Sequence, residues 1–312
     1  MKLYIDKENL LSFIKSNADD LFEDCSRLIK RELDVQFNFS REDSRSNEYL
    51  QAWFAHFGEG IIGKQTFVPD DTREIIPPRP LKSNFLNMTS SKDGLKSIYL
   101  LNDNHMCDVV KNKSCIMIGK IGEEIEVLSS LILDDSEKAT HEILSWDDYC
   151  PTLPLTDIIL CDNHYFKHKD IYEKNNNELI RCLASIPNGS PINVIIFTKT
   201  GEIDKSIDLN QEQKTIKTIV KKESGSNKST VTIVVSYATH DRNLITNYYR
   251  IKTGSCVHLK FNHIKKDVTT EIKSHANRNN EKISKKLIKA FQGIINEKPI
   301  CYGDKVSNFI TF

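Results

Sequence analysis

Residues 231–247 read VTIVVSYATHDRNLITN, and they decide the fold of the second half of this chain. The run from Val231 to Tyr237 is short, apolar and rich in β-branched residues, which is typical of a buried strand. A polar turn follows it, with His240, then Arg242 two residues on and Asn247 five further. The segment predicts a buried strand that ends in chemically active side chains.

Upstream of this segment, strands and helices alternate. Apolar runs at 156–161 and 192–198 predict strands, and periodic apolar residues predict helices over 167–186 and 210–222. Strand, helix, strand, helix, strand implies a parallel sheet with right-handed crossovers. Because such sheets bind ligands at the carboxyl ends of their strands, we expect the functional residues there.

Downstream, residues 243–251 and 256–261 alternate around a glycine-containing turn at 252–255, which predicts a hairpin. A long helix is expected over 268–296, with apolar residues on one face and lysines on another. The predicted fold class of this half is therefore α/β, with a parallel or mixed sheet flanked by helices.

The first half has a different pattern and predicts a mixed α+β domain. Amphipathic periodicity indicates helices over 6–17 and 19–33. Short apolar runs then predict a small sheet from 97–101, 115–119 and 125–128. We place the border near residue 150, between an α+β domain of residues 1–150 and an α/β domain of residues 151–312.

The net charge of zero conceals an asymmetry between these two halves. Residues 1–150 carry 18 Lys and Arg against 27 Asp and Glu, so of the 43 of each kind residues 151–312 carry 25 against 16. The basic excess concentrates after Arg250. Such a surface attracts polyphosphate, nucleic acid or an anionic membrane, and it could equally dock on the acidic half. Charge alone does not choose between these partners.

Composition excludes several classes of protein. No apolar run approaches the roughly 18–20 residues that span a bilayer, and the charged start of the chain differs from a signal peptide. These features predict a cytoplasmic protein with no membrane span. The eight cysteines include no Cys-x-x-Cys pair and no zinc spacing with histidine. We therefore expect reduced, mostly buried cysteines, no metal site and no cofactor.

Two further stretches carry a family resemblance. Residues 156–165 read TDIILCDNHY, and residues 240–247, HDRNLITN, precede a turn with Gly254. Together they resemble the phospholipase-D-like domain at the C-terminus of MIT-domain proteins and its bacterial relatives, over residues 155–275. The superfamily motif places lysine and aspartate where the second stretch has arginine and asparagine.

The resemblance implies a phospholipase D fold without the usual catalytic set, used for binding rather than hydrolysis. It also implies a bacterial protein, with a role in antiphage (antiviral) defence as one hypothesis. No MIT-type three-helix module is evident in the first 150 residues, so the partners of that family do not transfer to this chain. Whether the chain is an enzyme stays open, and the damaged motif favours binding.

A catalytic interpretation centres on His240. It would form a phosphohistidine, with a second copy supplied by a homodimer partner, and Arg242 would hold the phosphate. Asn247 is a weak replacement for the carboxylate that would orient the imidazole, although Asp162 or Asp241 could substitute. A second catalytic candidate near the end of the first parallel strand is His164.

A binding interpretation uses the basic residues instead. Phosphate or nucleic-acid contacts are expected from Arg242, Asn247, Lys260, Lys265, Lys266, Lys273 and Arg278. Our first hypothesis is a non-catalytic phosphate- or nucleic-acid-binding protein. The alternatives are a metal-independent dimeric phosphodiesterase or nuclease that uses His240, and a scaffold whose acidic N-terminal half recruits a protein partner.

Overall fold

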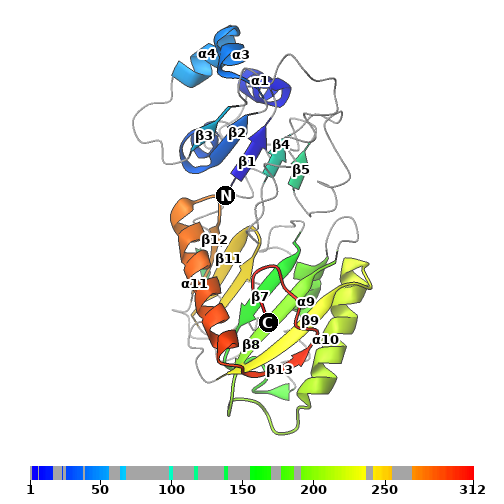
Figure 1. The fold of residues 1–312 in the computed structure, drawn as a ribbon. Helices are drawn as coiled ribbons and strands as arrows, with labels where there is room; N and C mark the ends of the chain where they lie inside the picture. Colours follow the sequence, from blue (N-terminus) through cyan, green and yellow to red (C-terminus); the bar gives the residue numbers. More distant parts are fainter. Residues whose placement is uncertain are drawn as a thin grey trace. The chain divides into compact units, whose positions relative to one another are not determined.

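The chain forms two compact units, Met1–Leu133 with Ala276–Arg278, and Asp134–His275 with Asn279–Phe312 (Figure 1). The border expected near residue 150 lies outside the described residues. The structure, a computed structural model, describes residues 2–5, 7–16, 23, 26–37, 39–55, 64–67, 98–100, 116–118, 137–139, 155–169, 177–185, 191–236, 242–254 and 269–312.

The first unit contains a five-stranded sheet in the order β3-β2-β1-β4-β5. Its strands are β1 (Lys2–Ile5), β2 (Asp34–Phe37), β3 (Gln65–Thr66), β4 (Ile98–Leu100) and β5 (Ile116–Ile118). Every pairing between neighbours is parallel. The described part of this unit is therefore α/β, which corrects the expected α+β arrangement, because β4 and β5 extend a parallel sheet instead of forming a separate one.

The helices described in the first unit lie between its strands. α1 (Lys7–Ser16) falls within the predicted helix 6–17. The predicted helix 19–33 contains a π-helical turn, η1 (Leu28–Glu32), and part of it lies outside the described residues. Two shorter helices follow β2, α3 (Arg41–Arg45) and α4 (Glu48–Ala55). The apolar run at 125–128 lies outside the described residues.

The second unit has an eight-stranded mixed sheet in the order β13-β9-β8-β7-β10-β11-β12-β6, which confirms the α/β class. The central strands β7 (Asp157–Cys161), β8 (Asn193–Lys199) and β9 (Thr230–Ser236) are parallel, as the sequence predicts. The remaining strands pair antiparallel: β10 (Asn243–Thr246), β11 (Tyr249–Thr253), β12 (Thr269–Ser274) and β6 (Glu137–Ala139) on one side, and β13 (Ile300–Gly303) on the other.

Two helices connect the parallel strands. α9 (Asn177–Ala184) lies within the predicted helix 167–186. Residues 163–166 form turns and Lys169 is already helical, so helical structure begins within two residues of the predicted start. α10 (Leu209–Ser224) begins at an Asp208 cap that accepts from the Asn210 amide and ends at Gly225 with a left-handed φ of 62°. These caps place both ends of α10 within two residues of the prediction.

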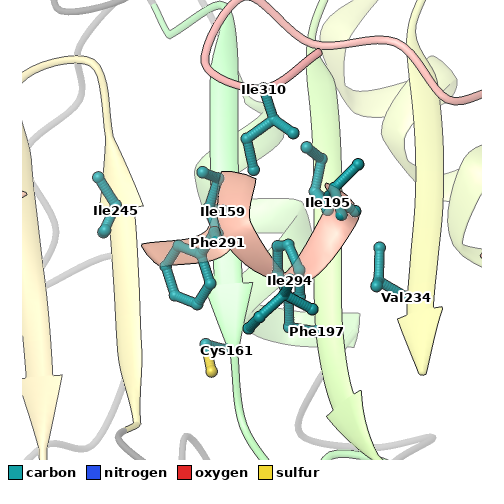
Figure 2. Close-up of a cluster of buried hydrophobic side chains, with 10 residues drawn as sticks. Ile159, Cys161, Ile195, Phe197, Val234, Ile245, Phe291, Ile294 and Ile310 are labelled. Atoms are coloured by element: carbon teal, nitrogen blue, oxygen red, sulfur yellow. The ribbon is translucent and has the colours of Figure 1, made fainter. Parts of the chain in front are cut away.

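A third helix, α11 (Arg278–Asn296), covers one face of the central strands. Phe291 and Ile294 lie against Ile159, Ile195 and Phe197 (Figure 2). The rings of Phe197 and Phe291 stack with centroids 4.6 Å apart. This cluster fixes the strands whose carboxyl ends form the candidate site.

The structure corrects two expectations about the second unit. Residues 269–274 form β12 and not the start of a helix over 268–296, because they pair with β11 and β6 and their side chains alternate between half-buried and buried. A hairpin turn lies at Asn247 and Tyr248, between β10 and β11, inside the run 243–251 that the sequence predicts as one strand. The expected second hairpin strand at 256–261 lies outside the described residues.

Candidate functional site

The carboxyl end of β7 brings an acid and a base together. Asp162 follows the last residue of β7, and the antiparallel register pairs Cys161 of β7 with Asn243 of β10. This register places Arg242, just before β10, opposite Asp162. The Arg242 Nε atom lies 3.4 Å from Asp162 Oδ1, and Arg242 Nη1 donates to the Gly254 carbonyl at 3.1 Å. The hydrogen bond to Gly254 and the neighbouring Asp162 carboxylate restrain the guanidinium group.

Asp162 is fully buried, whereas the Arg242 side chain retains 24% of its exposure. Beyond the ion pair, Asp162 Oδ1 accepts a hydrogen bond from the His164 amide at 2.9 Å, which closes a tight turn. The Tyr165 ring is buried beneath this turn, and burial, with the Asp162 charge as the next cause, raises the pKa of its hydroxyl. The carboxylate therefore holds the arginine from the protein side and leaves part of it facing solvent.

A second charged group lies on the same edge. His164 Nδ1 lies 3.1 Å from Glu202 Oε2, and Lys167 Nζ lies 3.0 Å from the same oxygen. Glu202 follows β8 after a turn at Gly201, whose φ of 85° suits a residue without a side chain. The Lys167 hydrogen bond is the main cause that lowers the pKa of the Glu202 carboxyl. This group supplies an imidazole held by a carboxylate.

Asn247 does not join Arg242 and His164. The register puts Thr246 opposite Ile158, so Asn247 lies at the other end of β10, five residues or about 16 Å from Arg242. Its side chain is fully buried, and its Oδ1 accepts from the Thr156 amide at 2.7 Å and the Asp157 amide at 3.0 Å. Asn247 therefore holds the start of β7 in the sheet, whereas the sequence predicted a phosphate contact for this residue.

Other expected site residues are dispersed or outside the described part. His240, Asp241, Lys260, Lys265 and Lys266 lie outside the described residues. Lys273 is on β12 with its Nζ 3.9 Å from Glu271 Oε2. Arg278 Nη2 pairs with Asp34 Oδ1 at 2.8 Å, and both residues belong to the first unit. Of the described candidates, the structure therefore brings together Arg242 and His164.

Sequence reasoning missed Glu202 and Lys167, which complete the charged edge. Glu202 lies four residues after the end of the parallel strand predicted at 192–198, a position where ligand-facing side chains are common. The position of Glu202 after this strand is the signal by which the sequence could have identified it. Among the described residues, no three His, Cys, Asp or Glu side chains form a group that could hold a metal ion.

Comparison with known proteins adds no family to this description. No protein-family model matches the sequence, and no curated protein matches it at a significant level. Within the described part of the chain, the helices are too short or too polar to cross a membrane.

Proposed function

We propose that this protein binds phosphate groups of nucleic acid without cleaving them, through the carboxyl edge of the second sheet. The observation that carries the proposal is the placement of Arg242 at this edge, fixed by Asp162 and the Gly254 carbonyl. A planar guanidinium with a fixed orientation offers paired donors to a phosphate and loses little entropy when it binds.

The charges at the edge support binding of an anion. Two carboxylates at this edge already have a cationic partner, Asp162 with Arg242 and Glu202 with Lys167. An approaching phosphate therefore meets these two carboxylates with their charge compensated. Lys167 and Arg242 both keep exposed surface, which allows them to contact a ligand from the solvent side.

The position of Asn247 supports binding over hydrolysis. We infer that the HDRNLITN segment belongs to a degenerate phospholipase-D-like domain, in which an aspartate normally stands at this place. Here the amide oxygen is committed to two backbone N–H groups at the far end of β10. Asn247 therefore supplies no carboxylate that could orient a histidine at the carboxyl edge.

A substitution at Arg242 tests the proposal. Anisotropy titration of labelled DNA and RNA should show that Arg242→Gln weakens binding about tenfold or more, the loss of a charge-assisted contact of about 1.5–3 kcal/mol. Arg242→Lys keeps the charge opposite Asp162 but loses the fork, so it should bind with intermediate affinity. Arg181→Gln, at an exposed position on α9, is the matched control. Equal affinities for all four proteins would overturn the proposal.

One observation favours a second function, a metal-independent phosphodiesterase. The 3.1 Å pair between His164 and Glu202 resembles the carboxylate-supported histidine of hydrolytic sites. This alternative requires turnover of a nitrophenyl phosphodiester in the presence of EDTA, lost on His164→Gln. Absence of turnover by the wild-type protein at high enzyme concentration would leave binding as the function.

A further inference from the structure

The helix α11 presents three lysines on the face opposite its buried side. Lys282, Lys286 and Lys289 follow one another at helical spacing, and all three are exposed. Because an α-helix rotates by about 100° per residue, the mean direction of the three lysines is almost opposite to that of Phe291. Phe291 packs into the core of the sheet. We call these three lysines the α11 basic face.

No acidic residue of α11 neutralises the charge of this face. Glu281 is the one acidic residue of α11, and it is 15% exposed and paired with Lys285 at 2.9 Å. Among the described residues, no carboxylate lies within ion-pair distance of the three lysines. Their positive charge is therefore available to an external anion.

The packing of α11 argues against a membrane as that anion. An amphipathic helix binds a bilayer by inserting its apolar side between the lipids. The apolar side of α11 is occupied, since Phe291, Ile294 and Ile295 lie in the core cluster. Figure 2 shows Phe291 and Ile294 in it. The face that meets solvent offers lysines and a single large apolar side chain, Ile283.

The absence of exposed aromatic rings on α11 argues against a single strand. Proteins that hold single-stranded nucleic acid stack the bases on aromatic side chains. Phe291, the only aromatic residue of α11, is buried. A face with lysines and no stacking surface is suited to the backbone of a duplex.

We propose that the α11 basic face binds the phosphate backbone of double-stranded nucleic acid, without reading its sequence. The inference rests on the proposed phosphate-binding function and names its partner. The lysines span seven residues, or about 10 Å, over which a duplex carries about six phosphates. The spacing of the lysines is therefore comparable with the spacing of phosphates along a duplex.

A salt titration with a matched charge control tests this inference. The triple variant Lys282→Gln, Lys286→Gln, Lys289→Gln keeps good helix formers at exposed sites, so α11 should stay folded. With labelled duplex DNA from about 50 to 200 mM salt, the slope of log affinity against log salt should fall by about two to three, because up to three phosphate contacts are lost. The affinity at the lowest salt should drop at least about tenfold.

The control removes the same charge from another surface of the second unit. Lys214→Gln, Lys222→Gln and Lys228→Gln change three exposed lysines and should leave the salt slope unchanged. Equal slopes for the two triple variants would overturn the α11 inference. If Arg242→Gln still weakened binding in that case, the proposed function would stand without it.

Two more probes separate the alternative ligands. Single-stranded DNA of the same length should bind more weakly than the duplex and respond less to the α11 variant. Vesicles of phosphatidylcholine with phosphatidylserine should bind equally weakly to wild type and variant. Stronger binding to the single strand or to the vesicles than to the duplex would overturn the inference. No binding of wild type to any nucleic acid at low salt would remove the proposed function as well.

Discussion

At the scale of single residues, buried polar groups at opposite ends of β7 have different tasks. At the carboxyl end, Asp162 orients Arg242 toward solvent. At the amino end, Asn247 has its oxygen between two backbone amides and is fully buried. Both are polar groups in an apolar sheet, where a lost partner costs the full desolvation of the group left behind. The two positions should therefore respond differently to substitution.

We predict that Asn247→Ala lowers stability and leaves ligand affinity unchanged. The alanine leaves the Thr156 and Asp157 amides buried without their acceptor, at a cost of about 1–3 kcal/mol for each. Urea titration followed by circular dichroism measures the loss. Asn247→Asp keeps an oxygen at the same place and should restore part of the stability. A variant as stable as wild type that binds nucleic acid more weakly would return Asn247 to the binding site.

A second residue-scale prediction concerns His275, at the end of β12. The ring is fully buried, with Nε2 2.8 Å from Ser284 Oγ, and burial lowers the pKa of the imidazole to about 3. The unfolded chain protonates this histidine near pH 6.5, while the folded chain does not. The stability contributed by neutral His275 is thus fully present above pH 6.5 and is lost as the pH falls toward 3.

The measurement compares wild type with His275→Gln, which does not titrate. Urea titrations at pH 6.5 and 5 should show the stability advantage of wild type shrinking by about 1.7 kcal/mol, because the slope rises from half of about 1.4 kcal/mol per pH unit at pH 6.5 to nearly all of it at pH 5. Acidic groups titrate in both proteins, so the difference isolates the histidine. An advantage that stays constant over this range would contradict burial of a neutral ring.

At the scale of elements, packing decides what sequence patterns leave open. The parallel strands β7, β8 and β9 could be predicted because long apolar runs with β-branched residues have few other placements. β12 could not, because Thr270, Ile272 and Ser274 fit a strand while their neighbours continue the helical pattern of α11. Pairing with β11 and β6 determines that these residues form a strand. β6 is a three-residue strand that is distant in sequence, so this pairing could not be predicted.

The candidate site shows the same limit. The end of a strand indicated Asp162, His164 and Arg242 as members of one edge. The pairing of Arg242 with Asp162 depends on the register between β7 and β10, which the sequence does not specify. The pairing of His164 with Glu202 depends on how two loops fold toward each other. Local patterns predict which edge is used, and tertiary contacts choose the partners.

We predict that Phe291→Ala in α11 destabilises the second unit by about 3–5 kcal/mol. The side chain is 5% exposed and stacks on Phe197, and truncating a buried aromatic removes transfer energy and leaves a cavity. Lys289→Ala, two residues earlier on the exposed face, should change stability by less than about 0.5 kcal/mol. Urea titration of both variants checks the pair. Similar losses for the two would contradict the assigned orientation of α11.

At the scale of the whole molecule, each unit has its own sheet, and the end of the chain completes the second one. β13 adds an antiparallel edge strand to β9, and Ile310 enters the core cluster. The tail then returns to the start of β7, where Asn308 donates its amide to Asp157 Oδ1 at 2.7 Å and its side chain to Oδ2 at 2.6 Å. These partners are 151 residues apart in sequence, so the contact closes the unit.

We therefore predict that Asp157 and Asn308 are coupled in stability. Asp157 is a fully buried carboxylate that accepts hydrogen bonds from Asn193, Ser307 and Asn308, all neutral donors. Hydrogen bonds to a charged group contribute more than neutral ones, so Asn308→Ala should cost about 1.5–3 kcal/mol in wild type. It should cost clearly less when Asp157→Asn has removed the charge.

A double-mutant cycle measures this coupling as the departure from additivity, expected within about 0.5–3 kcal/mol for residues in contact. Native-state hydrogen exchange of the β8 amides reports the stability of the second unit alone, because β8 pairs directly with β7 and β9. The cycle with Arg181→Gln in place of Asn308→Ala should be additive, since that exposed residue lies on α9. Additivity in both cycles would mean that the contact between Asn308 and Asp157 adds nothing to stability, because coupled residues depart from additivity.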